Sequence, residues 1–309
     1  MPADERSLIL HQYDASPFSE KVRKVLAIKD VAWHAVEQPN MMPKPDLLPL
    51  TGGYRRIPVL QIGAQVYCDS QLVIRVLDRL HPEPTIYPDG SEGTCHAWSL
   101  WADRHLFLAV VAVVFAEIGA FVPAAFIADR TKMMPGRDFN ELPREAPYAR
   151  EQLRGLVALV EAQLAGGRPF LLGRTPGLAD AAVFHPLWFL RVAPQAAATL
   201  EEFPRTREWA SRMDGLGQGK RSNLEPAAAL EIARKAKPAP ENGVAPGEPN
   251  GLAAGMRVTV MPDDYGFDPV AGKLVAASLH EIALERDDPA LGEIVVHFPR
   301  VGFRVSRAD

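Results

Sequence analysis

The first eighty residues alternate short apolar runs with segments of helical periodicity. Alternation from Ser7 to Tyr13 predicts a strand, and Ser16-Pro17 predicts the start of a helix, because serine caps helices and proline suits their first turn. Residues 33–36 predict a second strand, and residues 57–67 predict a hairpin. A further helix is predicted from Asp69-Ser70 onward. Its apolar face is formed by Leu72, Val73, Val76, Leu77 and Leu80.

The resulting order is βαβ followed by ββα, within about eighty residues. This is the size and order of a thioredoxin-like domain, which we expect over residues 1–83. Residues 90–235 then predict an all-helical domain, with no strand between about 94 and 235. The expected helices of that domain are 95–120, 148–165, 178–192, 203–215 and 225–236.

The apolar stretch from 106 to 128 approaches the length that crosses a bilayer. Glu117 interrupts it, and a carboxylate at the bilayer centre costs at least ~2.5 kcal/mol. Pro123 follows six residues later. We therefore expect a helix buried in the helical domain and bent near Pro123, and no membrane span.

The last quarter of the chain changes character twice. Residues 236–255 are rich in proline and glycine and predict an extended linker. Residues 256–309 alternate apolar and polar positions between turn signals, which predicts a small all-β, five-strand, barrel-like module. So short a module is marginally stable alone, and we expect it to cover a sheet edge or to dock on the helical domain or a partner. The predicted fold class is thus α+β and multidomain.

Composition narrows the function. The chain has 309 residues, 47% hydrophobic and 23% charged, as expected for a globular protein. Its net charge of −4 disfavours a general nucleic-acid binder, which needs a basic surface. Two cysteines and the lack of a signal-peptide pattern predict a reducing, cytoplasmic location. The eight histidines are scattered, so we predict no metal site.

Three features of the first domain carry candidate chemistry. Ser16 places a hydroxyl at a helix N-terminus, where N–H groups and the helix dipole favour an anion such as a thiolate. Pro58 at the start of a hairpin suggests a cis bond that leaves the Ile57 backbone free to pair with an extended peptide. Asp69 and Ser70 suit an ammonium and a carboxylate. Each feature alone also fits a purely structural role: Ser16 as a helix cap, Pro58 as a trans proline at a sheet edge, and Asp69 as an ordinary acidic N-cap.

Together these features resemble one family, the cytosolic glutathione transferases, and within it the serine-type classes such as tau and theta. The motifs are Ser16-Pro17-Phe18-Ser19-Glu20-Lys21-Val22-Arg23, Arg56-Ile57-Pro58-Val59-Leu60 and Asp69-Ser70. The resemblance covers about residues 8–82 well and 95–215 more loosely, through Trp98-Ser99-Leu100-Trp101-Ala102-Asp103 and Leu178-Ala179-Asp180. It does not cover 236–309, which makes the β module an addition to the family plan.

The resemblance implies a role for each matching residue. Ser16 is the implied catalytic residue, which hydrogen-bonds the glutathione sulfur; Tyr13 is the less favoured alternative. The residues implied to bind glutathione are Lys44, Arg56, Ile57, Pro58, Asp69 and Ser70. The residues expected on the wall for a hydrophobic electrophile are Phe107, Val111, Val114 and Phe115, each of which also fits core packing.

The implied function is detoxifying glutathione transfer: conjugation, isomerisation or peroxide reduction by the glutathione thiolate. The alternative is a non-catalytic glutathione-binding or protein-interaction protein on the same scaffold. The resemblance also implies a homodimer, and the β module suggests a protein partner. The sequence departs from the family pattern at Gly177, where serine or threonine is usual, and at the Gly52-Gly53 insertion.

Overall fold

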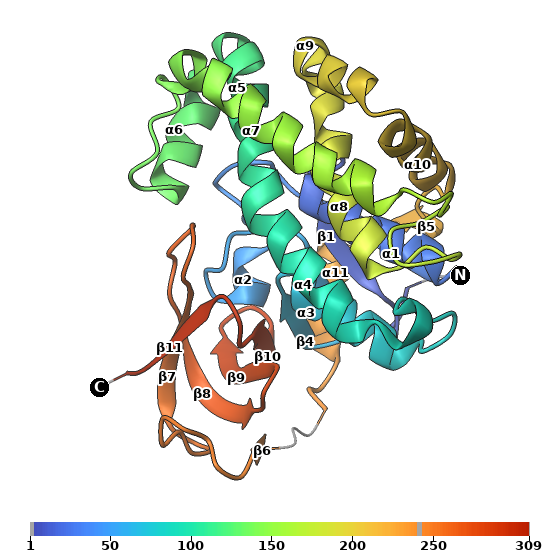
Figure 1. Cartoon of the computed structure of the whole chain (residues 1–309). Coiled ribbons are helices and arrows are strands. Elements are labelled where there is room, and N and C mark those ends of the chain that lie inside the picture. Colours follow the sequence, from blue (N-terminus) through green and yellow to red (C-terminus); the bar gives the residue numbers. More distant parts are fainter. Residues whose placement is uncertain (1–2, 240–242, 309) are drawn as a thin grey trace.

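The computed structural model describes residues 3–239 and 243–308 (Figure 1). The first domain has the predicted thioredoxin-like order, with β1 parallel to β2, β1 antiparallel to β3, and β3 antiparallel to β4. Its elements are β1 Ile9–Gln12, α1 Pro17–Ile28, β2 Ala32–Glu37, α2 Leu48–Thr51, β3 Val59–Ile62, β4 Gln65–Cys68 and α3 Ser70–Leu80. This order confirms the prediction for the N-terminal fold.

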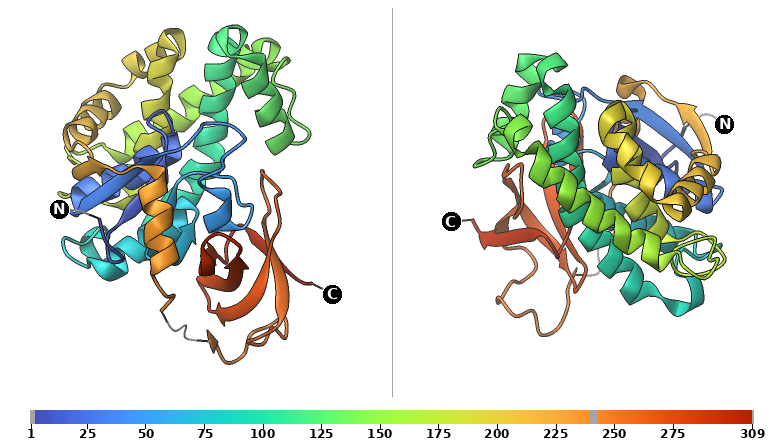
Figure 2. Two further views of the ribbon diagram at one scale, coloured as in Figure 1. Left: turned by 180° about the vertical axis from the view of Figure 1, so that it is seen from behind. Right: turned by 45° about the horizontal axis from the view of Figure 1, so that its top comes forward.

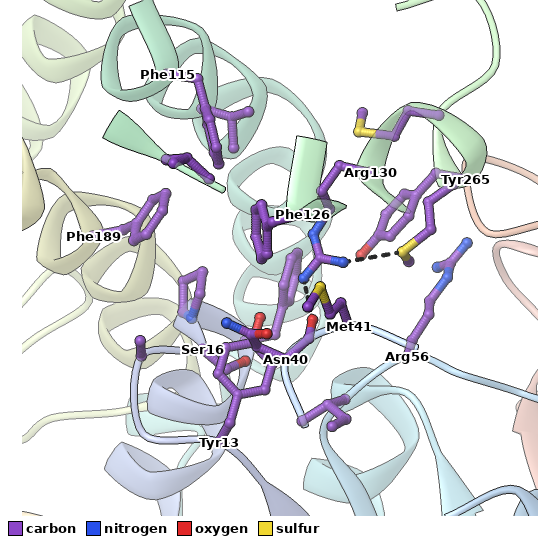
Figure 3. A pocket seen from close by; sticks show the side chains of 18 of the residues that line it. Tyr13, Ser16, Asn40, Met41, Arg56, Phe115, Phe126, Arg130, Phe189 and Tyr265 are labelled. Atoms are coloured by element: carbon purple, nitrogen blue, oxygen red, sulfur yellow. Dashed lines mark hydrogen bonds between the residues drawn. The ribbon is translucent and has the colours of Figure 1, made fainter. Parts of the chain in front are cut away.

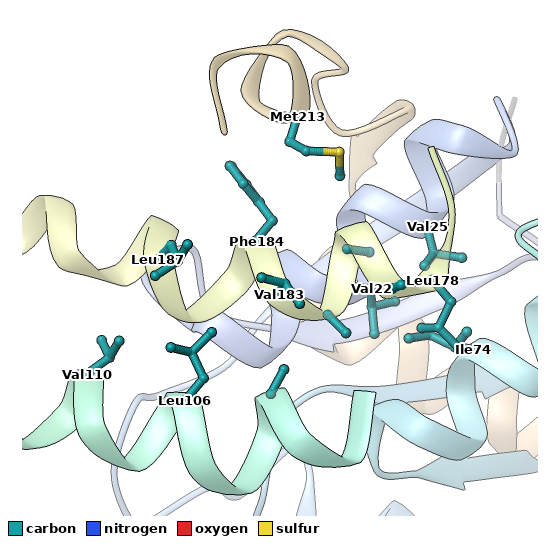
Figure 4. Packing of buried hydrophobic residues seen from close by; sticks show 14 of the residues in the cluster. Val22, Val25, Ile74, Leu106, Val110, Leu178, Val183, Phe184, Leu187 and Met213 are labelled. Carbon is teal, nitrogen blue, oxygen red and sulfur yellow. The ribbon is translucent and has the colours of Figure 1, made fainter. Parts of the chain in front are cut away.

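Helices α1 and α3 pack against each other, and both begin at the predicted caps. Ser16 caps α1 and Asp69 caps α3. Their apolar faces, which include Val22, Val25 and Ile74, join the core that the first domain shares with the helical domain (Figure 4). The most extensive contact between the two domains is that of α1 with α8. The two domains therefore share one core, and this fixes the N-terminus of α1 against the helices.

The helical domain contains four of the five predicted helical segments, and two helices that the sequence pattern did not predict, α6 and α9. Its elements are α4 Glu92–Trp101, a π-helical turn Ala102–Leu106, α5 Phe107–Ile118, α6 Ala124–Met133, α7 Leu142–Gln163, α8 Leu178–Phe189, α9 Pro194–Ala197 and α10 Pro204–Gly215. Short 3₁₀ turns lie at Pro88–Gly90, Gly119–Phe121, Leu190–Val192 and Ala198–Glu202. Figure 1 shows α5, α6, α7, α9 and α10 in the upper part of the molecule, on the side away from strands β7 to β10, whereas α4 runs down beside the first domain.

Within the described chain, one continuous helical segment, Glu92–Phe121, is long and apolar enough to cross a membrane. Here α5 packs on α7 and α8, with Val110 and Val114 fully buried. Glu117 accepts hydrogen bonds from the backbone N–H groups of residues 195 and 196, at 3.1 and 2.9 Å. The packing supports a helix inside the domain. Instead of bending, the helix ends, and Pro123 caps α6.

Gly177, the departure from the family pattern, has a steric cause. A Cβ atom at this position would lie 2.7 Å from the Ile86 carbonyl oxygen and 2.8 Å from Cδ of Pro88. Asp180 supplies the helix cap, because its carboxylate accepts from the N–H groups of Gly177 at 2.9 Å and Leu171 at 2.8 Å. It also accepts from Nε1 of Trp209 at 2.8 Å. A side chain at 177 would therefore displace the loop that the cap holds.

We expect Gly177→Ala to destabilise the protein by about 1–3 kcal/mol, because the added methyl group overpacks a closed site. The matched control is Gly155→Ala on α7, where a Cβ atom meets nothing within 4 Å. This control should leave stability unchanged or raise it by up to about 1 kcal/mol, since alanine favours helix. Urea unfolding of both variants measures the difference. Equal midpoints for the two would contradict the steric explanation.

The helical domain does not extend to residue 235, in contrast to the prediction. Residues Lys220–Asn223 form β5, which pairs in parallel with β2 at the edge of the first domain's sheet. Helix α11, Pro226–Lys235, then packs against that sheet (Figure 2). Ala229 of α11 is buried there in one cluster with Ile9 and Val36. The strand was missed because Lys-Arg-Ser-Asn carries no apolar alternation. It is mostly exposed and is held by backbone pairing.

The C-terminal region contains the five predicted strands, but they continue the first domain's sheet. Strand β10 pairs in parallel with β4, which gives the order β11-β7-β8-β9-β10-β4-β3-β1-β2-β5. The five strands are β7 Arg257–Pro262, β8 Val270–Ala277, β9 Glu281–Asp288, β10 Gly292–Pro299 and β11 Phe303–Arg307. The β module thus covers an edge of the N-terminal sheet, one of the expected positions. It is not a self-contained barrel.

The predicted linker is largely attached to the β module. Gly243–Val244 form the short strand β6, which pairs with β8, and Leu252 is buried in the module's core. Glu248 forms an ion pair with Arg300 at 3.1 Å. Residues 240–242 lie outside the described residues. The proline and glycine content predicted an extended segment, because a few contacts with distant residues leave no mark on local composition.

The β module and the first domain share a second core. Val59, Val66 and Cys68 of β3 and β4 are fully buried in the same cluster as Val296 and Phe298 of β10. The cysteine is therefore a core residue, and burial raises the pKa of its thiol well above the ordinary value. Gly52, with φ of 70°, lies against the Arg286 side chain, where a Cβ would clash. Gly52, which also ends α2, thus lets the Arg286 side chain of β9 approach the first domain closely.

Candidate active site

A cavity of about 380 Å³ lies between the first domain, the helical domain and the loop that precedes β8 (Figure 3). Ser16 and Tyr13 contribute from the first domain, Phe115 from α5 and Tyr265 from the β module. One part of the wall is aromatic and aliphatic, and another carries lysine and arginine side chains. The cavity therefore offers an apolar chamber beside a positively charged one.

Ser16 lies on the cavity wall at the N-terminus of α1. Its side chain is 2% exposed, and its Oγ accepts a hydrogen bond from the Ser19 N–H at 3.2 Å. The hydroxyl hydrogen remains available to donate to a group in the cavity. The first turn of the helix adds backbone N–H groups and the positive end of its dipole. Both effects stabilise a negative charge placed next to Ser16.

Tyr13, the alternative sulfur partner, lines the same cavity. It precedes the helix, and its ring lies 5.7 Å from Nζ of Lys44. The structure thus brings both hydroxyls to the cavity. Ser16 alone combines its hydroxyl with a helix N-terminus, which favours it as the group that faces an anion.

The Ile57–Pro58 peptide bond is cis, as predicted. Ile57 lines the large cavity and also a second, smaller cavity beside it. Among the described residues, neither its backbone N–H nor its C=O has a hydrogen-bond partner. Two peptide groups are thus available at the junction of the cavities for an extended peptide.

The second cavity, of about 30 Å³, is small and polar, and Asp69 and Ser70 lie in its wall at the N-terminus of α3. Asp69 has φ of 74°, a region that non-glycine residues seldom adopt and that clusters at functional sites. Its carboxylate accepts from the Gln71 N–H at 2.9 Å, and burial raises its pKa. The Ser70 hydroxyl accepts from Nζ of Lys21 at 3.4 Å. The predicted headgroup residues therefore lie together.

The positively charged part of the large cavity contains Lys44, Arg55 and Arg130. Arg55 and Arg130 both pair with Asp129, the latter at 2.6 Å. Lys44 is 3% exposed and donates to the Pro39 carbonyl. Three cations minus one carboxylate leave a charge of +2 when Lys44 is protonated. Burial, followed by the charges of Arg130 and Arg55, lowers the pKa of Lys44 to about 7. A carboxylate bound here would offset that charge.

We expect a ligand carboxylate at this site to bind more weakly as the pH rises through about 7, because Lys44 is charged below its lowered pKa and neutral above it. Titration calorimetry with S-methylglutathione, which has no thiol to ionise, should show this weakening between roughly pH 6 and 8. Lys44→Met should remove it, whereas Lys132→Met on the exposed side of α6 should keep it. An affinity of the unmodified protein that is constant across this range would contradict the assignment.

The resemblance implies that Arg56, like Lys44, is a partner of the glycyl carboxylate of glutathione, but the structure shows Arg56 engaged elsewhere. Its guanidinium pairs with Asp264 at 2.5 Å and lies 3.7 Å from the centre of the Tyr265 ring. Both residues belong to the loop between β7 and β8. The sequence could not reveal this, because Asp263-Asp264 indicated only a turn.

The apolar wall contains three of the four expected residues. Phe107, Val111 and Phe115 line the cavity at i, i+4 and i+8 on one face of α5. Val114 does not, because it lies on another face of the helix and is fully buried in the core. The sequence analysis missed the residues that complete the wall, which come from the end of α5, from α6 and α8, and from the connecting segments. They are Ile118, Val122, Pro123, Phe126, Met133, Met134, Phe139, Phe189 and Val192.

Over residues 3–239 and 243–308, no three His, Cys, Asp or Glu side chains gather as a metal-binding group.

The comparisons with known proteins agree with this geometry. Residues 10–85 match the glutathione S-transferase N-terminal domain, and residues 102–212 match the C-terminal domain. Glutathione S-transferase U7 of Arabidopsis thaliana is 24% identical over 65% of this chain and 80% of its own. The structure of rice GST1 in complex with glutathione is 21% identical, covers 75% of this chain and 96% of its own, and has a TM-score of 0.52.

A GST-like protein from Pseudomonas syringae is 39% identical, with a TM-score of 0.82. The match covers 98% of this chain and 99% of that one, so it includes the β module. The chain belongs to the glutathione S-transferase family.

Proposed function

We propose that this protein is a glutathione transferase in which Ser16 stabilises the glutathione thiolate for attack on a hydrophobic electrophile. The observation that carries the proposal is the position of the Ser16 hydroxyl, at a helix N-terminus and on the wall of a cavity whose other side is aromatic. In conjugation, the thiol proton leaves to solvent, the sulfur forms a bond to carbon, and the leaving group departs with its electron pair. Isomerisation and peroxide reduction start from the same thiolate.

The remaining implied residues support a single orientation of glutathione. Asp69 and Ser70 suit the γ-glutamyl headgroup, the free backbone groups of Ile57 suit the cysteinyl residue, and Lys44 suits the glycyl carboxylate. In this orientation the sulfur lies toward Ser16 and Phe107. Proximity then adds to thiolate stabilisation, because both reactants occupy one cavity.

A second candidate is a non-catalytic glutathione-binding protein. It is favoured by Arg56 and Lys44, whose cationic ends are engaged by Asp264 and by the Pro39 carbonyl. The discriminating experiment combines glutathione calorimetry with turnover across aryl halides, unsaturated carbonyls and hydroperoxides. Binding with turnover of any class supports the enzyme. Binding without turnover supports the second candidate, and no binding contradicts both.

We further propose a cytoplasmic homodimer. The family supports dimerisation, and both cysteines are buried and free, as expected in a reducing compartment. Both edges of β4 are taken, by β3 and by β10, so the dimer would use other surfaces. The β module is also the proposed contact for a protein partner. Light scattering should give twice the chain mass of 33.8 kDa, and a mass of one chain would contradict the dimer.

A further inference from the structure

The loop that connects β7 to β8 extends from the β module into the active site. Tyr265 lines both cavities, and Asp264 lines the smaller one. Figure 3 shows Tyr265 beside Arg56 at the edge of the large cavity. Nearly two hundred residues separate this loop from Asp69 and Ser70 in the sequence, yet they form one wall.

The loop is held on both sides of the site. The N–H of Gly266 donates to the Met133 carbonyl at the end of α6, at 2.6 Å. Asp263 pairs with Arg104 of the π-helical turn at 2.9 Å. These two contacts attach the loop to the helical domain, and the pair of Asp264 with Arg56 attaches it to the first domain.

Arg56 and Asp264 form the centre of this contact. The Arg56 side chain is 7% exposed, and its Nε has no hydrogen-bond partner among the described residues. Asp264 uses one oxygen, Oδ1, for both Arg56 and the Tyr265 N–H, the latter at 2.8 Å. Within residues 3–239 and 243–308, its other oxygen, Oδ2, accepts no hydrogen bond. An acceptor is thus available on the cavity wall.

The charges around the small cavity favour an ammonium group. Three aspartates and two arginines line it, which gives −1 when all are ionised. The lining charges are Asp69, Asp103, Asp264, Arg56 and Arg104. Asp103 is already paired with Lys21 at 2.7 Å, and Asp69 serves as the cap of α3. The volume of about 30 Å³ has room for one or two groups of water size.

We propose that the β module completes the glutathione site in the same chain, with Asp264 accepting the free α-ammonium of the γ-glutamyl residue. This rests on the proposed function and adds a specificity-determining residue to it. The α-carboxylate lies at Ser70 and the N-terminus of α3, and the ammonium lies between Asp69 and Oδ2 of Asp264. The site consequently selects thiol peptides whose first residue has a free amino group.

The test compares glutathione with N-acetylglutathione, which has no ammonium, by calorimetry on the full chain. The unmodified protein should prefer glutathione. Asp264→Asn should weaken glutathione binding about 10-fold, as expected for one charge-assisted contact, and leave N-acetylglutathione unchanged. Asp264→Glu should restore part of the preference. Asp268→Asn, the same change in the same loop but outside both cavities, should behave like the unmodified protein.

Each other outcome overturns the proposal in a recognisable way. Equal weakening of both ligands would mean that Asp264 only supports the loop. An unchanged preference in Asp264→Asn would mean that another group holds the ammonium. If the unmodified protein binds neither ligand, the proposed function fails and this inference fails with it.

Discussion

Turnover should fall roughly 10- to 150-fold when Ser16 is replaced by alanine. A hydrogen bond to a charged group contributes about 1.5–3 kcal/mol, and each 1.4 kcal/mol is a factor of ten. The loss should appear mainly in kcat at neutral pH and shrink at high pH, where glutathione ionises without help. A reactive aryl halide is a suitable substrate for the measurement.

Three variants separate this effect from its alternatives. Ser16→Thr keeps both hydroxyl and cap and should keep most of the activity. Ser19→Ala removes a buried hydroxyl from the same helix turn, one that lies outside the cavity lining and has no hydrogen-bond partner among the described residues, and it should be neutral. Tyr13→Phe should also be nearly neutral. A larger loss for Tyr13→Phe than for Ser16→Ala would assign the sulfur to the tyrosine. Urea unfolding of Ser16→Ala measures separately the stability lost with the helix cap, which is about 0.5–2 kcal/mol.

A chain ending at residue 239 should fail to remain folded and soluble. Truncation removes β10 from the edge of β4 and uncovers Tyr54, Val59, Val66 and Cys68, each 2% exposed or less in the full chain. Uncovering one such side chain costs about 1.5–3 kcal/mol, and a whole domain is stable by only about 5–15 kcal/mol. The unpaired edge of β4 also favours aggregation.

The truncated chain should therefore be recovered mainly from the insoluble fraction, or should unfold at a much lower urea concentration. Leu279→Ser is the matched control, because this module residue is 85% exposed and its replacement should shift stability by less than about 0.5 kcal/mol. A truncated chain that is soluble and unfolds cooperatively at the original midpoint would show that the module is an independent unit.

The sequence pattern within each element was sufficient to predict the first domain. It was not sufficient to predict how β5 and the β module attach to that domain. Ser16 and Asp69 mark helix starts because capping depends on neighbouring backbone groups, and both lie where the pattern predicts. The pairing of β10 with β4 joins residues more than two hundred positions apart. No periodicity encodes such a pairing, so the module looked independent. Strand β5 was missed because its sequence is polar.

The candidate site likewise has a part that the local sequence pattern predicts and a part that it does not. The spacing of Phe107, Val111 and Phe115 identifies a helix face, yet the face that meets the cavity and the face that meets the core are equally apolar. Val114 was therefore placed on the wrong face. Asp264 and Tyr265 lie in a polar turn whose sequence gives no indication of Arg56, since their contact depends on how the module docks.

The most direct test is the pKa of the glutathione thiol in the complex, measured by the ultraviolet absorbance of its thiolate. With the unmodified protein, the pKa should fall from about 8.5 toward about 6.5, which requires ~2.7 kcal/mol of thiolate stabilisation. In Ser16→Ala it should return most of the way to the value in solution. A bound thiol that titrates as it does in free solution, or equally in both proteins, would contradict the role of Ser16.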